Sequence, residues 1–294
     1  MGSMASLVAV GLDGSRESVT AALWAAREAD LRSVSLDLVH VEEWLDQPPL
    51  PVASAEVQRR WTEGLLREAS EEVRRLYPDL EVTSRRLHGI PAIALIHAAA
   101  SSDMLVLGSR GLGSVAGFIL GSVAGDTVVV AERPVVLVRS PHGTVTPADG
   151  FSTEGAIVVG VDLGRPCGGL LAFAFDEASR RRCPLRVVHA WTAPPVLSYA
   201  PSLDPGVQDE MSHGLATDLG TMTRPWSEKF PEVKFDVQVR VGQPAIQLVE
   251  AAHGAALLLV GRRIRRSVFG AHMGSIAHAV VHRAAAPVAV VAHE

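Results

Sequence analysis

The chain has 294 residues, about twice the commonest domain length of roughly 100–150 residues, so two domains are expected. Hydrophobic residues make up 48% of the chain and charged residues 20%, a balance that suits packed soluble cores and excludes a disordered chain. The net charge of -5 gives no electrostatic footprint for nucleic acid or for an anionic membrane.

The first half predicts alternating strands and helices. Residues 7–11 form a short apolar run that ends in Gly and Asp, which is typical of a buried parallel strand. Residues 15–31 carry apolar side chains at helical spacing. In chain order we predict strands over 7–11, 35–41, 81–87, 104–107 and 134–138, and helices over 15–31, 54–76, from Pro91 and over 121–131. The strand over 81–87 alternates in polarity, which favours a sheet edge.

The second half repeats the first. The repeated segments are 7–13 and 156–162, 89–93 and 242–246, and 121–124 and 274–277. The offset grows from 149 to 153 between the second and third strands, where a loop absorbs insertions at little cost. We therefore predict domains over 5–140 and 155–294, joined by a linker over 141–154. Each is an α/β, doubly wound domain with a five-stranded parallel sheet.

A glycine-rich loop follows the fourth strand of the first half. Gly108, two residues, Gly111, nine residues and then Gly121-Ser122 lead into a helix. Glycine lets the backbone approach a ligand closely, and a helix N-terminus presents free N–H groups and positive dipole to an anion. The Ser122 hydroxyl adds a donor. The pattern predicts a phosphate cradle at the carboxyl edge of the sheet, with a merely flexible loop as the alternative.

This motif, the Asp that ends the first strand and the Pro-Val of the last strand resemble the tandem, ATP-binding form of the universal stress protein family along nearly the whole chain. The resemblance implies a Rossmann-like fold of the adenine nucleotide alpha hydrolase-like kind in each half. It also implies bound ATP with Mg²⁺, Asp13 on the ribose hydroxyls beside Gly11, and the main chain of Val41 at the adenine. A carboxylate at a strand end is a good acceptor for a diol, although Asp also commonly caps a helix. The expected first-site residues are Gly11, Asp13, Val41, Gly108, Ser109, Arg110, Gly111, Leu112, Gly113, Ser114, Gly121, Ser122 and Val123.

The second half departs from this pattern. Ile264 stands where the second glycine belongs, and Leu163 and Gly164 replace Gly14 and Ser15. A β-branched residue disfavours φ > 0, so we expect this loop to follow a different path. Arginines at 262, 263, 265 and 266 either hold phosphates or form a solvated face. Nucleotide binding by this half is open, with contacts expected from Gly160, Asp162, Gly261, Arg262, Gly274 and Ser275.

Other binding sites are weaker hypotheses. A dinucleotide fingerprint fits residues 111–116, but it follows the fourth strand rather than the first, which argues against an oxidoreductase. His278 and His282 have metal-ligand spacing without an acidic third ligand, so we interpret them as surface histidines. His40 and His189, at equivalent strand ends, are expected to make local hydrogen bonds or line the pocket edge.

Hydrolysis of ATP is the enzymatic alternative. It needs charge on the γ-phosphate and a positioned water, and the sequence shows neither a Walker lysine nor an obvious base. We therefore interpret the protein as a nucleotide-responsive regulator of stress adaptation without strong catalysis. A slow ATP hydrolase and an interaction module with a degenerate second site are the alternatives.

The expected partners are ATP or another adenine nucleotide, a second copy in a homodimer and an unidentified protein, without nucleic acid or membrane. Family resemblance implies that the halves pack through their last strands, 135–138 and 288–291. The two cysteines, Cys167 and Cys183, form neither a disulfide framework nor a zinc site, so a reducing cytoplasm is the expected location.

Overall fold

The computed structural model describes residues 6–43, 52–109, 120–140, 155–192, 206–264 and 273–293. The chain divides into two compact units, Met1–Phe151 and Ser152–Glu294. The predicted linker, residues 141–154, lies outside the described residues, so its extent stays a prediction.

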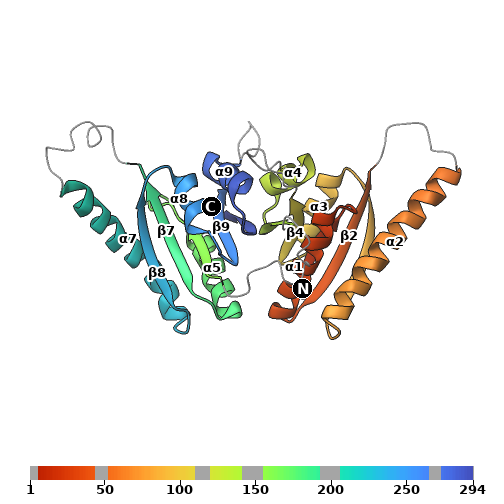
Figure 1. Ribbon diagram of the computed structural model, residues 1–294, viewed down its shortest axis with the longest axis horizontal. Helices are drawn as coiled ribbons and strands as arrows, with labels where there is room; N and C mark the ends of the chain where they lie inside the picture. Colours follow the sequence, from red (N-terminus) through yellow and green to blue (C-terminus); the bar gives the residue numbers. More distant parts are fainter. Residues whose placement is uncertain are drawn as a thin grey trace. The chain divides into compact units, whose positions relative to one another are not determined.

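Strands and helices alternate along the first unit (Figure 1). The elements are β1 (Leu7–Leu12), α1 (Arg16–Arg32), β2 (Ser35–Glu43), α2 (Val52–Leu76), β3 (Val82–Gly89), α3 (Pro91–Ala100), β4 (Met104–Ser109), α4 (Ser122–Val130) and β5 (Val135–Arg139). The strands are parallel and lie in the order β3-β2-β1-β4-β5. From β1 the chain adds strands on one side and then returns to add β4 and β5 on the other. This reversal places a topological switch point between β1 and β4.

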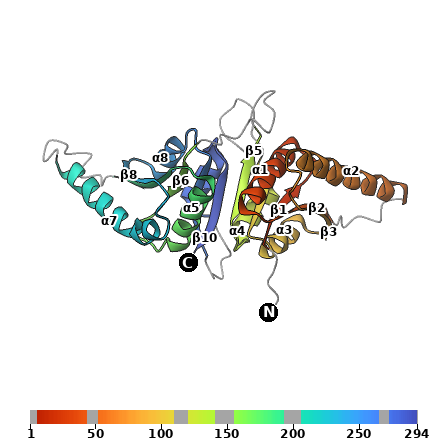
Figure 2. The same cartoon turned by 90° about the horizontal axis from the view of Figure 1, so that it is seen from below.

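The helices of the first unit cover both faces of its sheet. Helix α1 packs against α2, and α3 packs against α4. Figure 2 shows the first pair over one face and the second pair over the other. Right-handed crossovers require this arrangement when strands are added in both directions from β1.

The second unit repeats this organisation. Its elements are β6 (Ile157–Gly160), α5 (Gly168–Arg181), β7 (Leu185–Trp191), α7 (Val207–Lys229), β8 (Phe235–Val241), α8 (Pro244–Ala251), β9 (Leu257–Arg263), α9 (Ser275–Arg283) and β10 (Val288–His293). The strands are again parallel, in the order β8-β7-β6-β9-β10. The predicted fold class, tandem α/β domains with parallel sheets, is confirmed.

The apolar runs of the sequence become the centres of the sheets. Strand β4 is buried at five of its six positions and β5 at all five, because helices cover both faces of each sheet. Strand β3 is exposed at most positions and lies at the end of its unit's strand order. The prediction that this strand lies at an edge is therefore confirmed.

The predicted strand ends are short by one or two residues. Strand β2 continues through Glu42 and Glu43, whereas the hydropathy pattern predicts that it ends at Val41. Both glutamates pair with β3, and Glu42 also accepts a hydrogen bond from Thr62 Oγ1 at 3.0 Å. Tertiary pairing therefore extends a strand into charged sequence.

The duplication also includes a buried ion pair at the end of the first helix of each unit. In α1, Arg32 Nε lies 2.5 Å from Glu28 Oε1, and these side chains are 9% and 1% exposed. In α5, Arg181 pairs with Glu177 at 5% and 0% exposure, 149 positions further on. The two buried pairs thus occupy equivalent positions, as expected from a duplication.

Candidate functional site

A cavity of about 380 Å³ lies at the carboxyl ends of the central strands of the first unit, at the switch point. This volume is in the usual range for small-molecule sites, roughly 300–1,000 Å³. The cavity is lined by Gly11, Leu12, Asp13, Ser15, Ser18, Val39, His40, Val41, Pro91, Leu95, Leu107, Gly108, Gly121, Ser122, Val123 and Ala124. Seven of the predicted residues are thus brought together: Gly11, Asp13, Val41, Gly108, Gly121, Ser122 and Val123.

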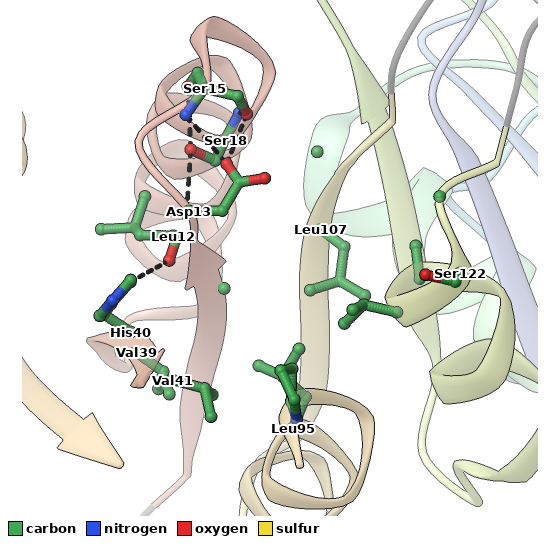
Figure 3. Close-up of a pocket in the computed structure, with 16 residues that line it drawn as sticks. Leu12, Asp13, Ser15, Ser18, Val39, His40, Val41, Leu95, Leu107 and Ser122 are labelled. Atoms are coloured by element: carbon green, nitrogen blue, oxygen red, sulfur yellow. Dashed lines mark hydrogen bonds between the residues drawn. The ribbon is translucent and has the colours of Figure 1, made fainter. Parts of the chain in front are cut away.

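The turn after β1 orients Asp13 at one side of the cavity (Figure 3). Gly14 has φ +82°, a conformation that side chains disfavour, and this lets the chain turn back at once into α1. Ser15 then donates to Asp13 Oδ1 from its main-chain N at 2.9 Å and from its hydroxyl at 2.5 Å. The side chain that caps α1 is Ser15, which accepts from the Ser18 N–H. The alternative role of Asp13 as the helix cap is therefore wrong.

The start of α4 forms the opposite side of the cavity, where Figure 3 shows Ser122 across from Asp13. Gly121 is the N-cap residue and supplies no side-chain hydrogen bond. The first N–H groups of a helix have no partner within it, so those of Ser122, Val123 and Ala124 depend on an outside acceptor. All three residues line the cavity. An anionic ligand is the kind of acceptor that this helix end favours.

Between these two sides the cavity wall is apolar. Val39, Val41, Pro91, Leu95 and Leu107 line it. His40 stands at its edge, and its Nδ1 donates to the Leu12 carbonyl oxygen at 2.7 Å. In the second unit His189 Nδ1 makes the same bond to the Val161 carbonyl at 3.0 Å. The expectation that both histidines make local hydrogen bonds at a pocket edge is confirmed.

Gly108 is glycine for a reason that the motif alone does not reveal. A Cβ there would lie 2.6 Å from the carbonyl carbon of Glu17 and 2.7 Å from the amide nitrogen of Ser18. These are main-chain atoms of α1, which rests directly on β4. A Cβ added at Gly121, in contrast, would meet no atom within 4 Å. The first glycine of the motif therefore permits helix packing, and the last one leaves space at the cavity.

We predict that Gly108→Ala destabilises the first unit by about 1–3 kcal/mol, because a main-chain clash cannot be relieved by a side-chain rotation. Gly121→Ala is the matched control, expected to change stability by no more than about 0.5 kcal/mol. Urea denaturation followed by circular dichroism measures both. Equal stabilities of the two variants would contradict this interpretation of Gly108.

Other predicted first-site residues do not line the cavity or are not described. Ser109 follows Gly108 in β4, is 2% exposed and does not line the cavity, because successive residues of a strand point to opposite faces. Arg110, Gly111, Leu112, Gly113 and Ser114 lie outside the described residues. Sequence reasoning missed Ser15 and Ser18; a Ser directly before a helical run is a recognisable N-cap signal for Ser15, and no such signal points to Ser18.

A larger cavity, about 610 Å³, occupies the equivalent place in the second unit. Five of the predicted residues line it: Gly160, Asp162, Gly261, Gly274 and Ser275. Arg262 does not line it, because its side chain is 4% exposed and points to the other face of β9. Arg263 lines the cavity instead, as strand alternation from Gly261 requires.

The loops that follow β4 and β9 lie outside the described residues, so the predicted difference in their paths stays a prediction. Strand β9 runs to Arg263. The Ile264 N–H then donates to the His293 carbonyl oxygen at 2.8 Å. Ile264 is not among the residues with positive φ in the described part of the chain. The main-chain amide at the second-glycine position is thus part of the sheet.

The remaining candidate groups give no site of their own. Cys167 and Cys183 are free thiols, and burial raises the pKa of each. The rings of His278 and His282 lie 4.4 Å apart, but the described residues contain no group of three or more potential metal ligands. No helix in the described part of the chain has both the length and the apolar character needed to cross a membrane.

The two units are thus doubly wound α/β domains, each with a cavity at its switch point and a helix N-terminus without a side-chain cap. The chain belongs to the universal stress protein family, because the sequence model of that family matches residues 4–139 and 155–292.

Its similarity to individual family members extends over both units. Universal stress protein Rv2005c of Mycobacterium tuberculosis is 34% identical over 294 residues, with 96% of each chain covered. Universal stress protein Rv1996 of the same organism is 35% identical over 312 residues, covering 96% of this chain and 94% of that relative. The crystal structure of a universal stress protein from Archaeoglobus fulgidus has a TM-score of 0.75 at 17% identity and covers 98% of each chain, so it shares the fold.

Proposed function

We propose that the first unit binds ATP and that the protein is a nucleotide-responsive regulator of stress adaptation in the cytoplasm. The observation that supports this most is the composition of the first cavity. It has a strand-end carboxylate on one side, an apolar wall, and an uncapped helix N-terminus on the other side. These three features match a ribose, a base and a phosphate chain in that order.

In the proposed complex, Asp13 accepts hydrogen bonds from the ribose hydroxyls. Its hydrogen bonds from Ser15 orient the carboxylate before the ligand arrives, which lowers the entropy lost on binding. Val41 and its apolar neighbours enclose the adenine, and the main chain of Val41 recognises its edge. The Ser122, Val123 and Ala124 amides and the Ser122 hydroxyl hold the phosphates.

Magnesium would be carried by the phosphates and water in this proposal. Magnesium commonly keeps several waters and binds through substrate phosphates plus one or two carboxylates. Among the described lining residues of the first cavity, Asp13 is the only carboxylate. A triphosphate beside a carboxylate benefits from a cation that neutralises part of its charge, so binding should require Mg²⁺.

We propose binding with at most slow hydrolysis. Fast phosphoryl transfer requires cationic side chains on the γ-phosphate and a positioned water. The described residues that line the first cavity include neither lysine nor arginine. ATP would then stay bound and change the affinity of the protein for a partner. That partner is another protein or a second copy of the chain.

The test is a calorimetric titration of nucleotide-free protein with ATP and MgCl₂, together with chromatography of any nucleotide released by denaturing freshly purified protein. We expect the titration to show ATP binding that a substitution of Asp13 weakens. We expect phosphate release no faster than about one turnover per hour, the range of an unassisted GTPase. Absence of that component defeats the proposal and favours an interaction module. Rapid phosphate release instead favours the hydrolase.

A further inference from the structure

One aromatic side chain outside the first cavity touches the turn that carries Asp13. The ring of Trp61, in α2, lies so close to Gly14 that a Cβ added to this glycine would be 2.7 Å from the ring atom Cζ2 and 3.1 Å from Cη2. Gly14 also has φ +82°. Glycine at this position therefore serves two purposes, because it permits the turn and leaves room for the indole.

The same ring contacts a residue of the cavity wall. Trp61 packs edge-on against His40, with ring centroids 5.5 Å apart and ring planes at 73°. His40 is buried, and its Nδ1 donates to the Leu12 carbonyl oxygen. Figure 3 shows Leu12, Asp13 and His40 together on one side of the pocket. Trp61 thus supports the end of β1 through His40 and the turn after it through Gly14.

Helix α2 is anchored next to Trp61. Thr62 is fully buried, and its hydroxyl donates to Glu42 Oε1 at 3.0 Å. Leu66, one turn further along the helix, is also buried. Trp61 itself is 50% exposed, so its replacement should leave these anchoring contacts and the core of the unit in place.

The second unit exchanges the two sizes that meet at this contact. Its turn has Leu163 where the first unit has Gly14. Its helix α7 has Gly214 where α2 has Trp61, at the offset of 153 that also relates the starts of β3 and β8. A Cβ added to Gly214 would meet no atom within 4 Å. In each unit one of the two positions is therefore glycine and the other carries a large side chain, as expected where two positions share one packing space.

The turn beneath Trp61 is closed by polar contacts of its own. The Ser15 N–H donates to Asp13 Oδ1 at 2.9 Å, the Ser18 N–H donates to Ser15 Oγ at 3.2 Å, and the Asp13 N–H donates to Ser18 Oγ at 3.3 Å. Asp13 and Gly14 are exposed, so water competes for these bonds whenever the turn opens. A ring packed on Gly14 restricts that opening and keeps the carboxylate in one position before a ligand binds.

We infer that Trp61 is a positioning residue of the first cavity, which holds the Gly14 turn and thereby sets the preference of the site for a ribose that carries its 2′- and 3′-hydroxyls. Trp61 does not itself line the cavity. It acts through Gly14 and His40 on the place of the Asp13 carboxylate. The inference rests on the proposed function of the first unit, because the preference concerns the nucleotide bound there.

The first test needs no ligand. Amide hydrogen exchange of the nucleotide-free full chain, followed residue by residue with NMR, reports how often the turn opens. In Trp61→Ala the amides of Ser15 and Ser18 should exchange about 10-fold faster than in the wild type, because both donate to side chains of the turn. Trp61→Phe keeps an aromatic ring against Gly14 and should restore most of the protection.

The second test measures recognition of the ribose. Calorimetry in MgCl₂ compares the affinity of the full chain for ATP with its affinity for 2′,3′-dideoxy-ATP. Trp61→Ala should weaken binding of ATP about 10-fold and binding of the dideoxy analogue much less, because the carboxylate is no longer held in place while the phosphate contacts remain. The ratio of the two affinities should therefore fall in Trp61→Ala and stay at the wild-type value in Trp61→Phe.

Leu66→Ala is the matched control for a loss of packing in the same helix. Leu66 is buried and shares a surface groove with Val82 of β3. Its truncation should lower the urea midpoint more than Trp61→Ala does, since it leaves a cavity in the core. It should leave the exchange of the Ser15 and Ser18 amides and the ratio of the two affinities unchanged.

Each outcome bears on a different statement. The inference is overturned if Trp61→Ala changes neither the exchange of the turn amides nor the affinity ratio, or if Leu66→Ala changes them equally. Faster exchange with an unchanged ratio would overturn the effect on ribose preference. A wild-type chain that binds no ATP would defeat the proposed function, whereas faster exchange in Trp61→Ala, restored by Trp61→Phe, would still support the hold of Trp61 on the turn.

Discussion

Asp13→Asn is expected to weaken binding of Mg²⁺–ATP to the first unit by about 10- to 100-fold, the usual loss for hydrogen bonds to a charged group. Asparagine keeps an oxygen that accepts from Ser15, so the turn and the cap of α1 should be preserved. What is lost is the negative charge and one acceptor for the ribose diol. Calorimetry with ATP and MgCl₂ measures the change.

Two controls make this result specific. Asp162→Asn alters the equivalent strand end of the second unit and should leave the first-site affinity unchanged. The preference for ATP over its 2′,3′-dideoxy analogue should also shrink in Asp13→Asn, because the diol loses its acceptor. An Asp13→Asn variant that binds ATP as the wild type does would remove the ribose role from this residue.

Glu28→Ala is expected to destabilise the first unit by about 3–5 kcal/mol, the usual cost of removing one partner from a buried ion pair. Arg32 is only 9% exposed, so its charge has little access to water once the Glu28 carboxylate is gone. The two units need not unfold together. Urea denaturation should therefore show the transition of the first unit at a lower urea concentration and the transition of the second unit unchanged.

The matched control is Glu56→Ala in α2, which breaks exposed ion pairs with Arg59 and with Arg60, the second at the same i,i+4 spacing as Glu28 and Arg32. Exposed pairs contribute little, so this variant should unfold with the wild-type midpoint. The double replacement Glu28→Leu with Arg32→Met should recover most of the lost stability, because packed apolar groups substitute well for a buried pair. If Glu28→Ala behaved like Glu56→Ala, the burial of this pair would not matter to the fold.

Much of the fold follows from local sequence patterns. The apolar runs at 7–11 and 104–107 become central strands because only a strand covered on both faces buries so many consecutive apolar side chains. Pro91 begins α3, as its fixed φ favours. The strand ends are less predictable, since Glu42 and Glu43 belong to β2 through pairing with His88 and Gly89, which lie 46 residues further along the chain.

The site was less predictable because its chemistry depends on contacts across elements. The glycine spacing correctly places Gly108 and Gly121 at one cavity, yet Gly108 is required by the main chain of α1. The sequence alone does not tell whether Arg262 or Arg263 faces the cavity. The register of β9 decides which of the two side chains reaches it.

The turn after the first strand of each unit also bears on how a duplicated gene diverges. Asp13 and Asp162 both lie at exposed edges, away from the buried residues that fold each sheet. Replacing Gly14 and Ser15 by Leu163 and Gly164 at this margin goes with a later start of the first helix, while the hydrophobic interior of each sheet remains intact. A duplicated unit can thus change the rim of its cavity without changing the core on which its fold depends.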